Sequence, residues 1–511
     1  MTDMHDNEAK EITLVGVVGA GTMGQGIIQV AAAGGMTVLA YDEKPQAAET
    51  AKSKIANFLG RAVEKQRMTA SEAAAAIKRI IIIQKFEDLA KADLVIEAII
   101  ENLEIKKSLF AKLESVVPQH TILASNTSSL SITGIASNCE HPQRVAGFHF
   151  FNPVPLMKLV EVIPGLRTES WVLDKLMDVG TRMTRKPVIC ADTPGFLVNH
   201  LGRGYMPEAL RVLDEGIAKH NDIDCIMTGA AGFRMGPFSL VDLVGADVAS
   251  PVMDAIYQQY YHEPAYQPSQ ILNLRMQGGI LGLKTGSGFY EYSKGKKVEP
   301  EPVDTPQNRS MSVHIGNGDV EGTKLLTAFI ESAGVTIRSD ASDDTLTLLP
   351  LVGTGLSTAI ALNGLDPTRT VAVDTLFGLE GVRTLMVTPA TSNEVRAQAH
   401  GLLGVDNASV AVINDSPGFV SQRLVAMIVN VACHMAQRGV SSPEDIDTGA
   451  RLGLNYPKGP FELAEEIGAN RILKILEELE AFYGEPRYRP SAWLRRRVDL
   501  GLPLDLPDAV L

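Results

Sequence analysis

The chain has 511 residues, of which 45% are hydrophobic and 21% are charged, a composition typical of a globular protein with several domains. A formal net charge of −13 argues against a nucleic acid partner, because phosphates require a basic face. The polar residues 1–10 and the short apolar runs predict neither a secretory signal nor a membrane span, so we expect a cytoplasmic protein. Four widely spaced cysteines without a CxxC pair predict neither disulfides nor a metal site.

The first predicted elements form the phosphate-binding unit of a dinucleotide fold. An apolar strand, 12–18, leads into the turn Gly19-Ala-Gly21-Thr22-Met23-Gly24, which a helix to Ala33 and a second strand, 37–41, follow. In this order the first glycine permits the tight turn, the second lets the backbone approach a pyrophosphate, and the third allows close packing of helix on strand. Asp42 then stands where an acid binds the ribose 2′-hydroxyl and disfavours a 2′-phosphate. The sequence therefore predicts NAD as the cofactor, bound at this turn.

Strands and helices continue to alternate, which predicts a doubly wound α/β sheet of the Rossmann type. Ligands of such sheets bind beyond the carboxyl ends of the strands, and Glu101, Asn126 and Ser128 follow predicted strand ends. The further strands are expected at 80–83, 94–100, 121–124 and 145–151.

A basic run from Lys44 to Arg67 includes Lys54, Arg61 and Lys65. Its charge fits either a solvated helix face or a binding site for an anionic ligand.

The stretch His149–Ile163 places a histidine and a carboxylate in an otherwise apolar segment. His149 and Glu161 each lie six residues from Pro155, so a fold-back at this turn would bring them together. A histidine can accept a proton from a substrate hydroxyl, and a carboxylate on its other ring nitrogen fixes the tautomer. Beside an NAD fold, the pair predicts oxidation of a secondary alcohol, with His149 as the general base.

These motifs, in this order, resemble those of the 3-hydroxyacyl-CoA dehydrogenase family. The resemblance covers residues 12 to about 292 and rests on GAGTMG (19–24), VIEAIIENLEIKKSLF (95–110), ASNTSSLSI (124–132), GFHFFNPVPLMKLVEV (147–162), DTPGFLVN (192–199), GPFSLVDLVG (236–245) and GLKTGSGFYEY (282–292). It implies NAD-dependent oxidation of a (3S)-3-hydroxyacyl-CoA to the 3-oxoacyl-CoA, with a Rossmann-type sheet followed by an all-α domain.

The resemblance also implies roles for single residues. His149 would be the base, Glu161 its partner, and Ser128 and Asn199 would bind the substrate oxygen and support the histidine. The residues expected around NAD are Gly19, Gly21, Thr22, Met23, Gly24, Asp42, Glu101, Lys106, Asn126, Ser128, Asn152 and Lys284. The family places CoA against the helical region after the second strand, which implies contacts from Lys54, Arg61 and Lys65. A serine expected in that region is not matched here, and Phe58 stands near its place.

The chain also contains an internal repeat at an offset of 223 positions. Asp192–Phe196 recurs as Asp415–Phe419, and Gly236-Pro-Phe238 recurs as Gly459-Pro-Phe461. The Asp and the Thr or Ser before each proline predict the start of the helix that follows. Two helical domains of one design are therefore expected.

Upstream of the second helical domain the likeness weakens and the chemistry is lost. At an offset of 225, Asp374 stands opposite His149, Met386 opposite Glu161 and Gly353 opposite Ser128, while Gln422 replaces Asn199. No GxGxxG follows a strand in this half. We therefore expect a degenerate tandem repeat of the second half of the unit, which neither catalyses nor binds NAD in the same way.

The expected domains are an NAD-binding domain, 1–191; a first helical domain, 192–295; a linker rich in Pro and charge, 296–312; a degenerate Rossmann-like segment, 313–405; and a second helical domain, 406–511. In the resembled family the helical domains pair in a dimer. The tandem helical domains therefore imply an intramolecular pseudo-dimer. The resemblance leaves open whether the chain also forms homo-oligomers.

Alternatives remain for the substrate and for the class of protein. The long form with a duplicated tail is similar both to 3-hydroxyadipyl-CoA dehydrogenases of bacterial phenylacetate catabolism and to 3-hydroxybutyryl-CoA dehydrogenases of fatty acid metabolism. A dehydrogenase of a free hydroxy acid such as gulonate is a second possibility. A non-catalytic NAD-binding scaffold is a third.

Overall fold

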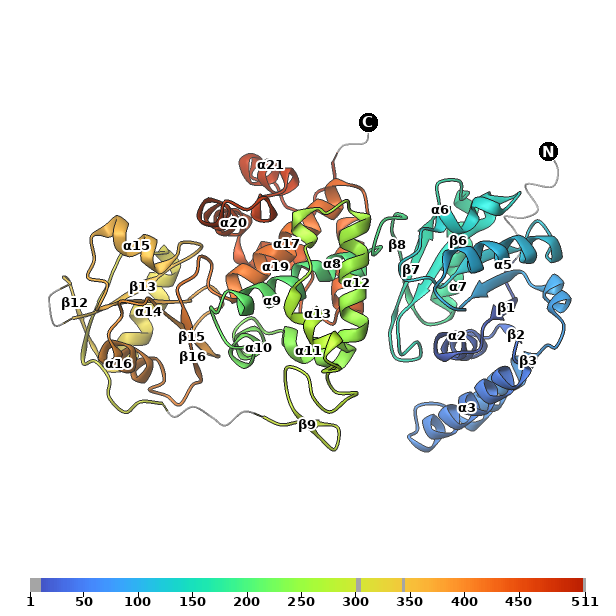
Figure 1. Cartoon of the computed structure of the whole chain (residues 1–511), viewed down its shortest axis with the longest axis horizontal. Coiled ribbons are helices and arrows are strands. Elements are labelled where there is room, and N and C mark those ends of the chain that lie inside the picture. The colour runs from blue at the N-terminus through green and yellow to red at the C-terminus, as the bar shows by residue number, and fades with distance from the viewer. Residues whose placement is uncertain (1–10, 300–304, 342–344, 509–511) are drawn as a thin grey trace. The chain divides into compact units, whose positions relative to one another are not determined.

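The structure is a computed structural model that describes residues 11–299, 305–341 and 345–508. The polar amino terminus and part of the predicted linker, 300–304, therefore lie outside the described residues. The chain divides into two compact units, of which the first holds Met1–His200 with Arg438–Leu454 and the second holds Leu201–Gln437 with Asn455–Leu511. Figure 1 labels many of the elements of both units. The domain limits drawn from the sequence remain a prediction.

The first unit is built on an eight-stranded sheet with strand order β3-β2-β1-β4-β5-β6-β7-β8. Neighbouring strands are parallel except β6 and β7, which are antiparallel. The strands are β1 (Leu14–Val18), β2 (Thr37–Tyr41), β3 (Ile80–Ile82), β4 (Leu94–Glu97), β5 (Ile122–Ser125), β6 (Val145–Phe150), β7 (Leu159–Pro164) and β8 (Lys186–Ile189). The helices are α2 (Thr22–Ala33), α3 (Pro45–Glu64), α4 (Ala70–Arg79), α5 (Leu103–Val116), α6 (Ile132–Ile135), α7 (Ser170–Arg182), α8 (Val198–Leu201) and α18 (Pro443–Gly453).

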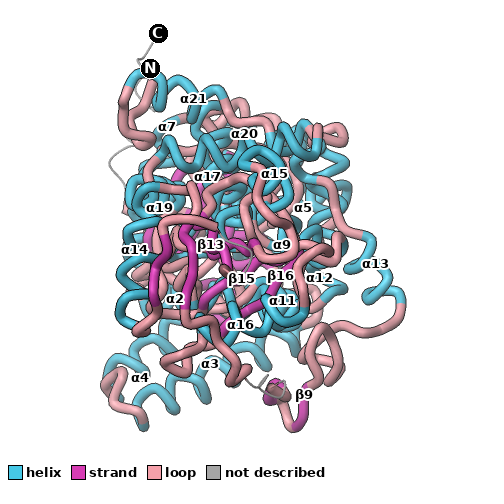
Figure 2. Tube along the Cα trace, turned by 90° about the vertical axis from the view of Figure 1, so that its left-hand side faces the viewer, coloured by secondary structure: helices cyan, strands magenta, loops and turns pink. Residues whose placement is uncertain are grey.

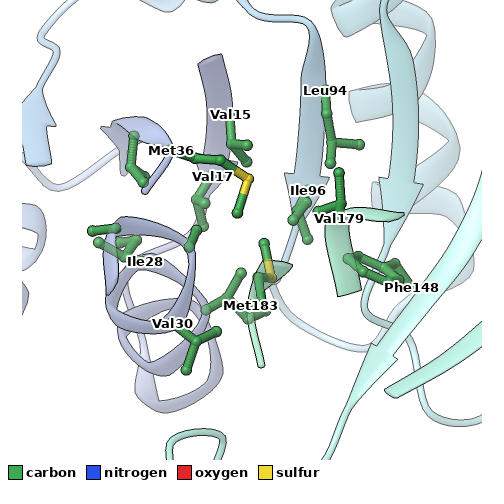
Figure 3. Packing of buried hydrophobic residues seen from close by; sticks show 14 of the residues in the cluster. Val15, Val17, Ile28, Val30, Met36, Leu94, Ile96, Phe148, Val179 and Met183 are labelled. Carbon is green, nitrogen blue, oxygen red and sulfur yellow. The ribbon is translucent and has the colours of Figure 1, made fainter. Parts of the chain in front are cut away.

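The core of this unit lies between the sheet and helices α2 and α7. Val15 and Val17 of β1 and Ile96 of β4 pack against Ile28 of α2 and Val179 of α7, all fully buried or nearly so (Figure 3). Burial of each such side chain contributes roughly 1.5–3 kcal/mol. The predicted Rossmann-type sheet is confirmed, and this core fixes the strand ends that carry the site.

One predicted strand is shorter than expected. The apolar run 94–100 leaves the sheet after Glu97, whose buried carboxylate accepts a hydrogen bond from the Ile99 amide at 2.7 Å. This local bond turns the chain away from the sheet before the apolar run has ended.

The second unit combines helices with a second sheet. The helices are α9 (Met206–Asp214), α10 (His220–Gly229), α11 (Pro237–Val244), α12 (Ala246–Gln259), α13 (Gln270–Gln277), α14 (Val320–Ser332), α15 (Leu356–Asn363), α16 (Asn393–Leu403), α17 (Ser421–Gln437), α19 (Pro460–Ile467), α20 (Ala469–Tyr483) and α21 (Ala492–Leu500). Two short strands, β9 (Tyr292–Ser293) and β10 (Lys296–Lys297), form a separate ribbon. Among the described residues, no helix is long and apolar enough to cross a bilayer.

The second sheet repeats much of the first. Its strands are β11 (Ser312–Ile315), β12 (Thr336–Arg338), β13 (Leu346–Pro350), β14 (Thr370–Val373), β15 (Arg383–Val387) and β16 (Val410–Asn414), in the order β12-β11-β13-β14-β15-β16. Figure 2 shows α14 and α16 beside these strands. The antiparallel pair β14–β15 corresponds to β6–β7 of the first sheet. The sheets differ beside this pair, because β11 pairs directly with β13, whereas β4 lies between β1 and β5 in the first sheet. The predicted degenerate repeat is confirmed, and its Rossmann-like segment begins with a β11-α14-β12 unit.

The repeated Asp–Thr/Ser–Pro motif has a different role from the one predicted. Asp192 accepts hydrogen bonds from the Ile132 and Thr133 amides at 2.9 and 2.8 Å, so it caps α6 and not the helix that follows it. Asp415 binds the Leu356 and Ser357 amides of α15 in the same way. Each carboxylate reaches a helix start some 60 residues earlier in the chain, because helix N-termini offer unpaired N–H groups. The aspartate of each motif therefore connects the segment after the last strand of its sheet to an earlier helix, α6 or α15.

The prediction that Met386 is equivalent to Glu161 was also wrong. The register places Met386 opposite Ala372, and the Asp374 amide donates to the Thr384 carbonyl at 3.1 Å. In the first sheet His149 lies opposite Glu161, so the second fold-back is two residues shorter. Thr384 therefore occupies the place opposite Asp374.

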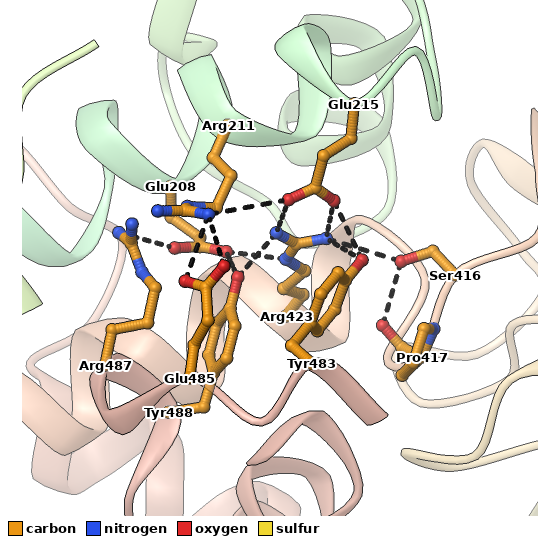
Figure 4. Close-up of polar contacts among 10 residues, drawn as sticks. All are labelled: Glu208, Arg211, Glu215, Ser416, Pro417, Arg423, Tyr483, Glu485, Arg487 and Tyr488. Carbon is orange, nitrogen blue, oxygen red and sulfur yellow. Dashed lines mark hydrogen bonds and ion pairs between the residues drawn. The ribbon is translucent and has the colours of Figure 1, made fainter. Parts of the chain in front are cut away.

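A buried ionic cluster joins α9 to α17 within the second unit (Figure 4). The fully buried Arg423 guanidinium contacts Glu208 at 2.5 Å and Glu215 at 2.8 Å. Arg487 contacts the second oxygen of Glu208 at 3.1 Å, and the Tyr488 hydroxyl donates to Glu208 at 2.9 Å. Burial alone would raise the pKa of Glu208, but the adjacent Arg423 and Arg487 lower it. We call these five residues the Arg423 cluster.

Replacing Arg423 by leucine should destabilise the protein by about 3–5 kcal/mol, because Glu208 would then be buried with much of its compensation lost. Urea unfolding measures this difference. The pKa of Glu208 is lowered from 4.5 in the folded protein. The stability difference between wild type and Arg423→Leu should therefore be fully present above pH 4.5 and should shrink as the pH falls below it.

The matched control is Arg495→Ala, which removes a half-exposed arginine paired with Glu477 at 2.7 Å. This substitution should lower the free energy of unfolding by no more than about 1 kcal/mol. Equal stability of the two variants would show that the Arg423 cluster contributes no more than a surface ion pair.

Candidate functional site

The turn after β1 has the geometry that phosphate binding requires. Gly19 has φ +99°, and a Cβ there would lie 2.5 Å from the Ala98 carbonyl oxygen. A Cβ on Gly24 would lie 1.8 Å from the Gly19 carbonyl oxygen, so helix and turn pack as closely as predicted. A Cβ on Gly21 would meet nothing within 4 Å. The exposed Gly21 thus leaves open space at the start of α2, where the amide groups suit a pyrophosphate.

Asp42 lies beside this turn. Its carboxylate accepts hydrogen bonds from the Ala20 amide at 2.8 Å and from the Lys44 amide at 2.9 Å. The half-buried carboxylate thus remains at the rim of the turn, where a ribose hydroxyl can reach it. Thr22 and Met23 form the first residues of α2. These residues fit the predicted NAD site.

The predicted pair of histidine and carboxylate is present in the first unit. His149 and Glu161 are directly opposite one another in the antiparallel β6–β7 pair, and Nδ1 of His149 lies 2.5 Å from Oε2 of Glu161. The two side chains are 5% and 1% exposed, so water scarcely competes for this contact. With Nδ1 donating to the carboxylate, Nε2 of the imidazole is free to accept a proton.

The other oxygen of Glu161 has partners that the sequence did not reveal. Oε1 accepts hydrogen bonds from the Leu197 and Val198 amides at 3.1 and 2.8 Å. The turn that presents these amides has positive φ at both Gly195 (+79°) and Phe196 (+48°). The same signs recur at Gly418 (+72°) and Phe419 (+47°). The repeated Pro-Gly-Phe sequence therefore indicated an unusual turn, but it did not indicate that the amides after this turn bind Glu161.

Glu101 organises the loop after β5. Its Oε1 accepts hydrogen bonds from the Thr127 hydroxyl at 2.7 Å, the Ser128 amide at 3.0 Å and the Ser129 amide at 3.1 Å. Burial would raise the pKa of Glu101, but the bond from Thr127 and the charge of Lys106 lower it. The carboxylate therefore stays ionised and positions Ser128.

Lys106 does not reach the surface. Its side chain is 1% exposed, and its ammonium group contacts Glu97 at 2.5 Å and Glu101 at 3.3 Å. Glu97, which the sequence analysis did not single out, also accepts a 2.6 Å hydrogen bond from Ser125. Lys106 therefore lies behind Glu101 and holds two carboxylates in place.

The other predicted residues lie at several places. Asn126 accepts a hydrogen bond from the Phe150 amide at 2.9 Å, which ties β5 to β6, and Asn152 is exposed after β6. Asn199 lies on α8, directly after Val198. Lys284 belongs to the second unit, where it pairs with Asp247 at 2.6 Å. The three basic residues Lys54, Arg61 and Lys65 are exposed on α3 or at its end.

The corresponding place in the second sheet is filled by its own hydrogen bonds. Gln422 donates to Asp374 at 2.9 Å and accepts from the Gly353 amide at 2.9 Å, and the Ser421 hydroxyl also donates to Asp374. Burial raises the pKa of Asp374, and the bonds from Ser421 and Gln422 oppose this rise. This network supports the expected loss of chemistry.

The turn before α14 is likewise filled by protein. Gly316 and Gly318 keep the first two glycines of a dinucleotide turn, but Glu321 stands at the third. The Asp319 carboxylate accepts a hydrogen bond from the Gly322 amide at 2.8 Å, and Arg471 pairs with Asp319 at 2.5 Å and Glu321 at 2.7 Å. Side-chain carboxylates thus occupy the helix start where an NAD site would hold phosphate.

Gly21→Ala should weaken NADH binding at least about tenfold while leaving folding unchanged, because its methyl group would fill only the open space of the turn. Gly24→Ala is the comparison, because its methyl would strike the Gly19 carbonyl and should lower the unfolding temperature. Fluorescence titration with NADH and thermal unfolding separate the two effects. Unchanged NADH affinity in folded Gly21→Ala would argue against this turn as the cofactor site.

Comparison with known proteins identifies the family. The NAD-binding domain of 3-hydroxyacyl-CoA dehydrogenase matches residues 14–193, and the C-terminal domain of the same family matches 195–292 and again 418–503. The 3-hydroxyadipyl-CoA dehydrogenase of Escherichia coli K12 is 39% identical over 486 residues, which cover 95% of this chain and 97% of that protein. A probable 3-hydroxybutyryl-CoA dehydrogenase of Bacillus subtilis is 42% identical over 284 residues, which cover 99% of that protein but 56% of this chain.

A solved structure agrees over nearly the whole length. The crystal structure of 3-hydroxybutyryl-CoA dehydrogenase from Escherichia coli K12 superposes with a TM-score of 0.85 at 38% identity, covering 96% of this chain and 99% of that one. The double match to the C-terminal domain agrees with the internal repeat. This chain therefore belongs to the 3-hydroxyacyl-CoA dehydrogenase family, and its amino-terminal unit carries that family's NAD-binding domain.

Proposed function

We propose that this chain oxidises (3S)-3-hydroxyacyl-CoA to 3-oxoacyl-CoA with NAD. The observation that carries the proposal is the buried contact between His149 and Glu161 at 2.5 Å, in a unit whose glycine turn fits NAD. His149 is the general base, and its Nε2 accepts the proton of the substrate 3-hydroxyl. Glu161 fixes the tautomer and stabilises the imidazolium that forms. The glycine turn and Asp42 would hold NAD, which would supply the acceptor for the hydride that leaves C3 of the substrate.

The substrate oxygen is positioned by Ser128 and Asn199 in this proposal. Ser128 is held by Glu101 at 3.0 Å through its amide, and Asn199 follows the amides that hold Glu161. Glu101, Asn126 and Asn152 surround the cofactor, with Lys106 acting through Glu101. The assignment of Lys284 to the NAD site rests on the family resemblance alone.

We infer the acyl group of the substrate from the relatives and the binding site of CoA from the positive charge of α3. The relative of matching length from Escherichia coli is named 3-hydroxyadipyl-CoA dehydrogenase, and the solved structure of matching length is described as 3-hydroxybutyryl-CoA dehydrogenase. Acyl chains of both kinds are therefore proposed, in phenylacetate catabolism or fatty acid metabolism in the cytoplasm. The exposed cations Lys54, Arg61 and Lys65 give α3 the positive charge that CoA phosphates need.

A free hydroxy acid such as gulonate is the second candidate substrate, and a non-catalytic NAD-binding scaffold is the third. The intact pair of His149 and Glu161 favours the enzyme. Oxidation of NADH by acetoacetyl-CoA, 3-oxoadipyl-CoA and free acetoacetate, together with reduction of NAD by gulonate, distinguishes all three. Turnover of the thioesters alone supports the proposal, and binding of NADH without any turnover supports the scaffold.

The two helical domains are proposed to pair as an intramolecular pseudo-dimer. The Arg423 cluster supports this pairing, because it joins α9 of the first helical domain to α17 of the second. At the repeat offset, His200 corresponds to Arg423, Val431 to Glu208 and Arg438 to Glu215. Two copies of one helical domain would not reproduce these ion pairs, so the charges favour pairing of unlike halves.

His149→Gln should lower turnover of acetoacetyl-CoA by roughly 100- to 10,000-fold, because the general base is lost. Binding of NADH should remain, since the glycine turn is unchanged. Steady-state kinetics and NADH titration provide the measurements. His262→Gln, at an exposed histidine of the second unit, is the control and should behave as wild type. Retained turnover in His149→Gln would remove the base from the proposal.

Truncation after Tyr292 should cause self-association or aggregation, because the apolar faces that pack against the second half become exposed. In the full chain the covalent link holds the halves together independently of protein concentration. Analytical ultracentrifugation over a range of concentrations tests the two proteins. A truncated chain that is soluble, monomeric and fully active would contradict the pseudo-dimer.

A further inference from the structure

Helix α18 belongs by sequence to the degenerate half but by contacts to the first unit. It is the repeat of α10, since Ile446 and Asp447 match Ile223 and Asp224 at the offset of 223. Residues Arg438–Leu454 nevertheless form part of the compact unit that holds the NAD-binding sheet. The segment before α18 is tied to the end of β8, because Ala191 donates to the Val440 carbonyl at 2.7 Å and Ser441 donates to the Ile189 carbonyl at 2.6 Å.

Two glycines, one helical turn apart, lie on the face of α18 that meets Leu159 of β7 and the Leu197–Val198 turn. A Cβ on Gly449 would lie 2.0 Å from Cδ2 of Leu197. A Cβ on Gly453 would lie 2.7 Å from Cγ2 of Val198 and 3.0 Å from Cδ2 of Leu159. Positions i and i+4 share one face of a helix, so the two glycines make one groove for these side chains.

The groove is specific to the second copy of this helix. The equivalent positions of α10 hold Ile226 and Ala230. A glycine inside a helix costs about 1 kcal/mol relative to alanine, so Gly449 calls for a compensating contact. Close approach of Leu197 and Val198 is that contact.

The residues in the groove are those that hold the catalytic carboxylate. Leu197 and Val198 donate their amides to Oε1 of Glu161 at 3.1 and 2.8 Å. Leu159 lies on β7 two residues before Glu161. Helix α18 therefore packs directly against both segments that position Glu161, whose other oxygen holds His149.

We propose that the degenerate half takes part in catalysis through α18, with Gly449 and Gly453 as positioning residues for Glu161. The inference rests on the proposed roles of His149 and Glu161. The helix fixes the Leu197–Val198 turn, the turn fixes the carboxylate, and the carboxylate orients the imidazole. The second half is thereby required for turnover and not only for stability.

Gly453→Ala tests the proposal with one methyl group. Val198 is β-branched and has little rotamer freedom, so the added methyl should displace the Val198 backbone. We expect kcat with acetoacetyl-CoA and NADH to fall roughly 10- to 100-fold, while KM and the NADH Kd stay within about twofold. Gly449→Ala should have a smaller effect, because its methyl meets a terminal methyl of Leu197, a side chain with more rotamers than the β-branched Val198.

Two further variants show whether the loss passes through Glu161. In a Glu161→Gln background, Gly453→Ala should cause no additional loss of kcat, because the carboxylate it displaces is already absent. Val198→Ala should restore much of the kcat of Gly453→Ala, since it removes the methyl groups that the new Cβ would strike. Glu444→Ala, at an exposed position of the same helix, is the control and should match wild type.

The outcomes separate this inference from the proposed function. If wild type turns over no thioester, or His149→Gln retains activity, the proposed function fails. If both behave as expected but folded Gly453→Ala keeps wild-type kcat, or loses as much in the Glu161→Gln background as in wild type, only the role of α18 fails. Should Gly453→Ala not fold, the same comparison with Gly449→Ala and Leu197→Ala decides the question.

Discussion

The buried carboxylate of Glu161 is the constraint on which the first unit depends. A carboxylate that is 1% exposed would cost several kcal/mol if its oxygens had no partners. One oxygen is held by two backbone amides and the other by His149, so both are satisfied. The antiparallel pairing of β6 and β7 makes this possible, because it sets two residues of one fold-back directly opposite each other. A register slip of one residue would send the two side chains to opposite faces of the sheet.

The two sheets show how one scaffold can keep its structural bonds and lose its chemistry. Asp192 and Asp415 cap equivalent helices, and the Gly-Phe turns after them have the same unusual backbone. These interactions satisfy N–H groups that any copy of the fold must satisfy. The position equivalent to the proposed base is different, since Asp374 there is bound by Gln422 and Ser421 from its own half. Likewise Asp319 and Glu321 occupy the helix start that would otherwise suit a phosphate.

Fusion of two copies permits contacts that a symmetric dimer cannot have. In an isologous interface every residue occurs on both sides, so a charge on one half is repeated on the other. In this chain Arg423 meets Glu208 and Glu215, whereas the repeat-related positions hold His200, Val431 and Arg438. The glycine groove of α18 is equally one-sided, because α10 has Ile226 and Ala230. Each half is therefore adapted to the other.

Local pattern was sufficient for much of this architecture. The apolar strand, the three glycines and Asp42 predicted the NAD turn, because each of these features depends on backbone geometry within some 30 residues. The spacing around Pro155 predicted that His149 and Glu161 would meet. The recurrence of Asp-x-Pro-Gly-Phe predicted the tandem repeat.

Tertiary structure alone decided which distant groups satisfy the buried charges. The Leu197 and Val198 amides that bind Glu161 lie 36 and 37 residues further along the chain, and backbone amides carry no side-chain signal. Asp192 caps a helix that begins 60 residues earlier, although its local sequence pointed to the helix after it. Lys106 is buried behind Glu101, and α18 joins the NAD-binding unit from more than 200 residues away. Such pairings follow from how the chain packs, because a buried polar group takes whichever partner the fold brings within hydrogen-bonding distance.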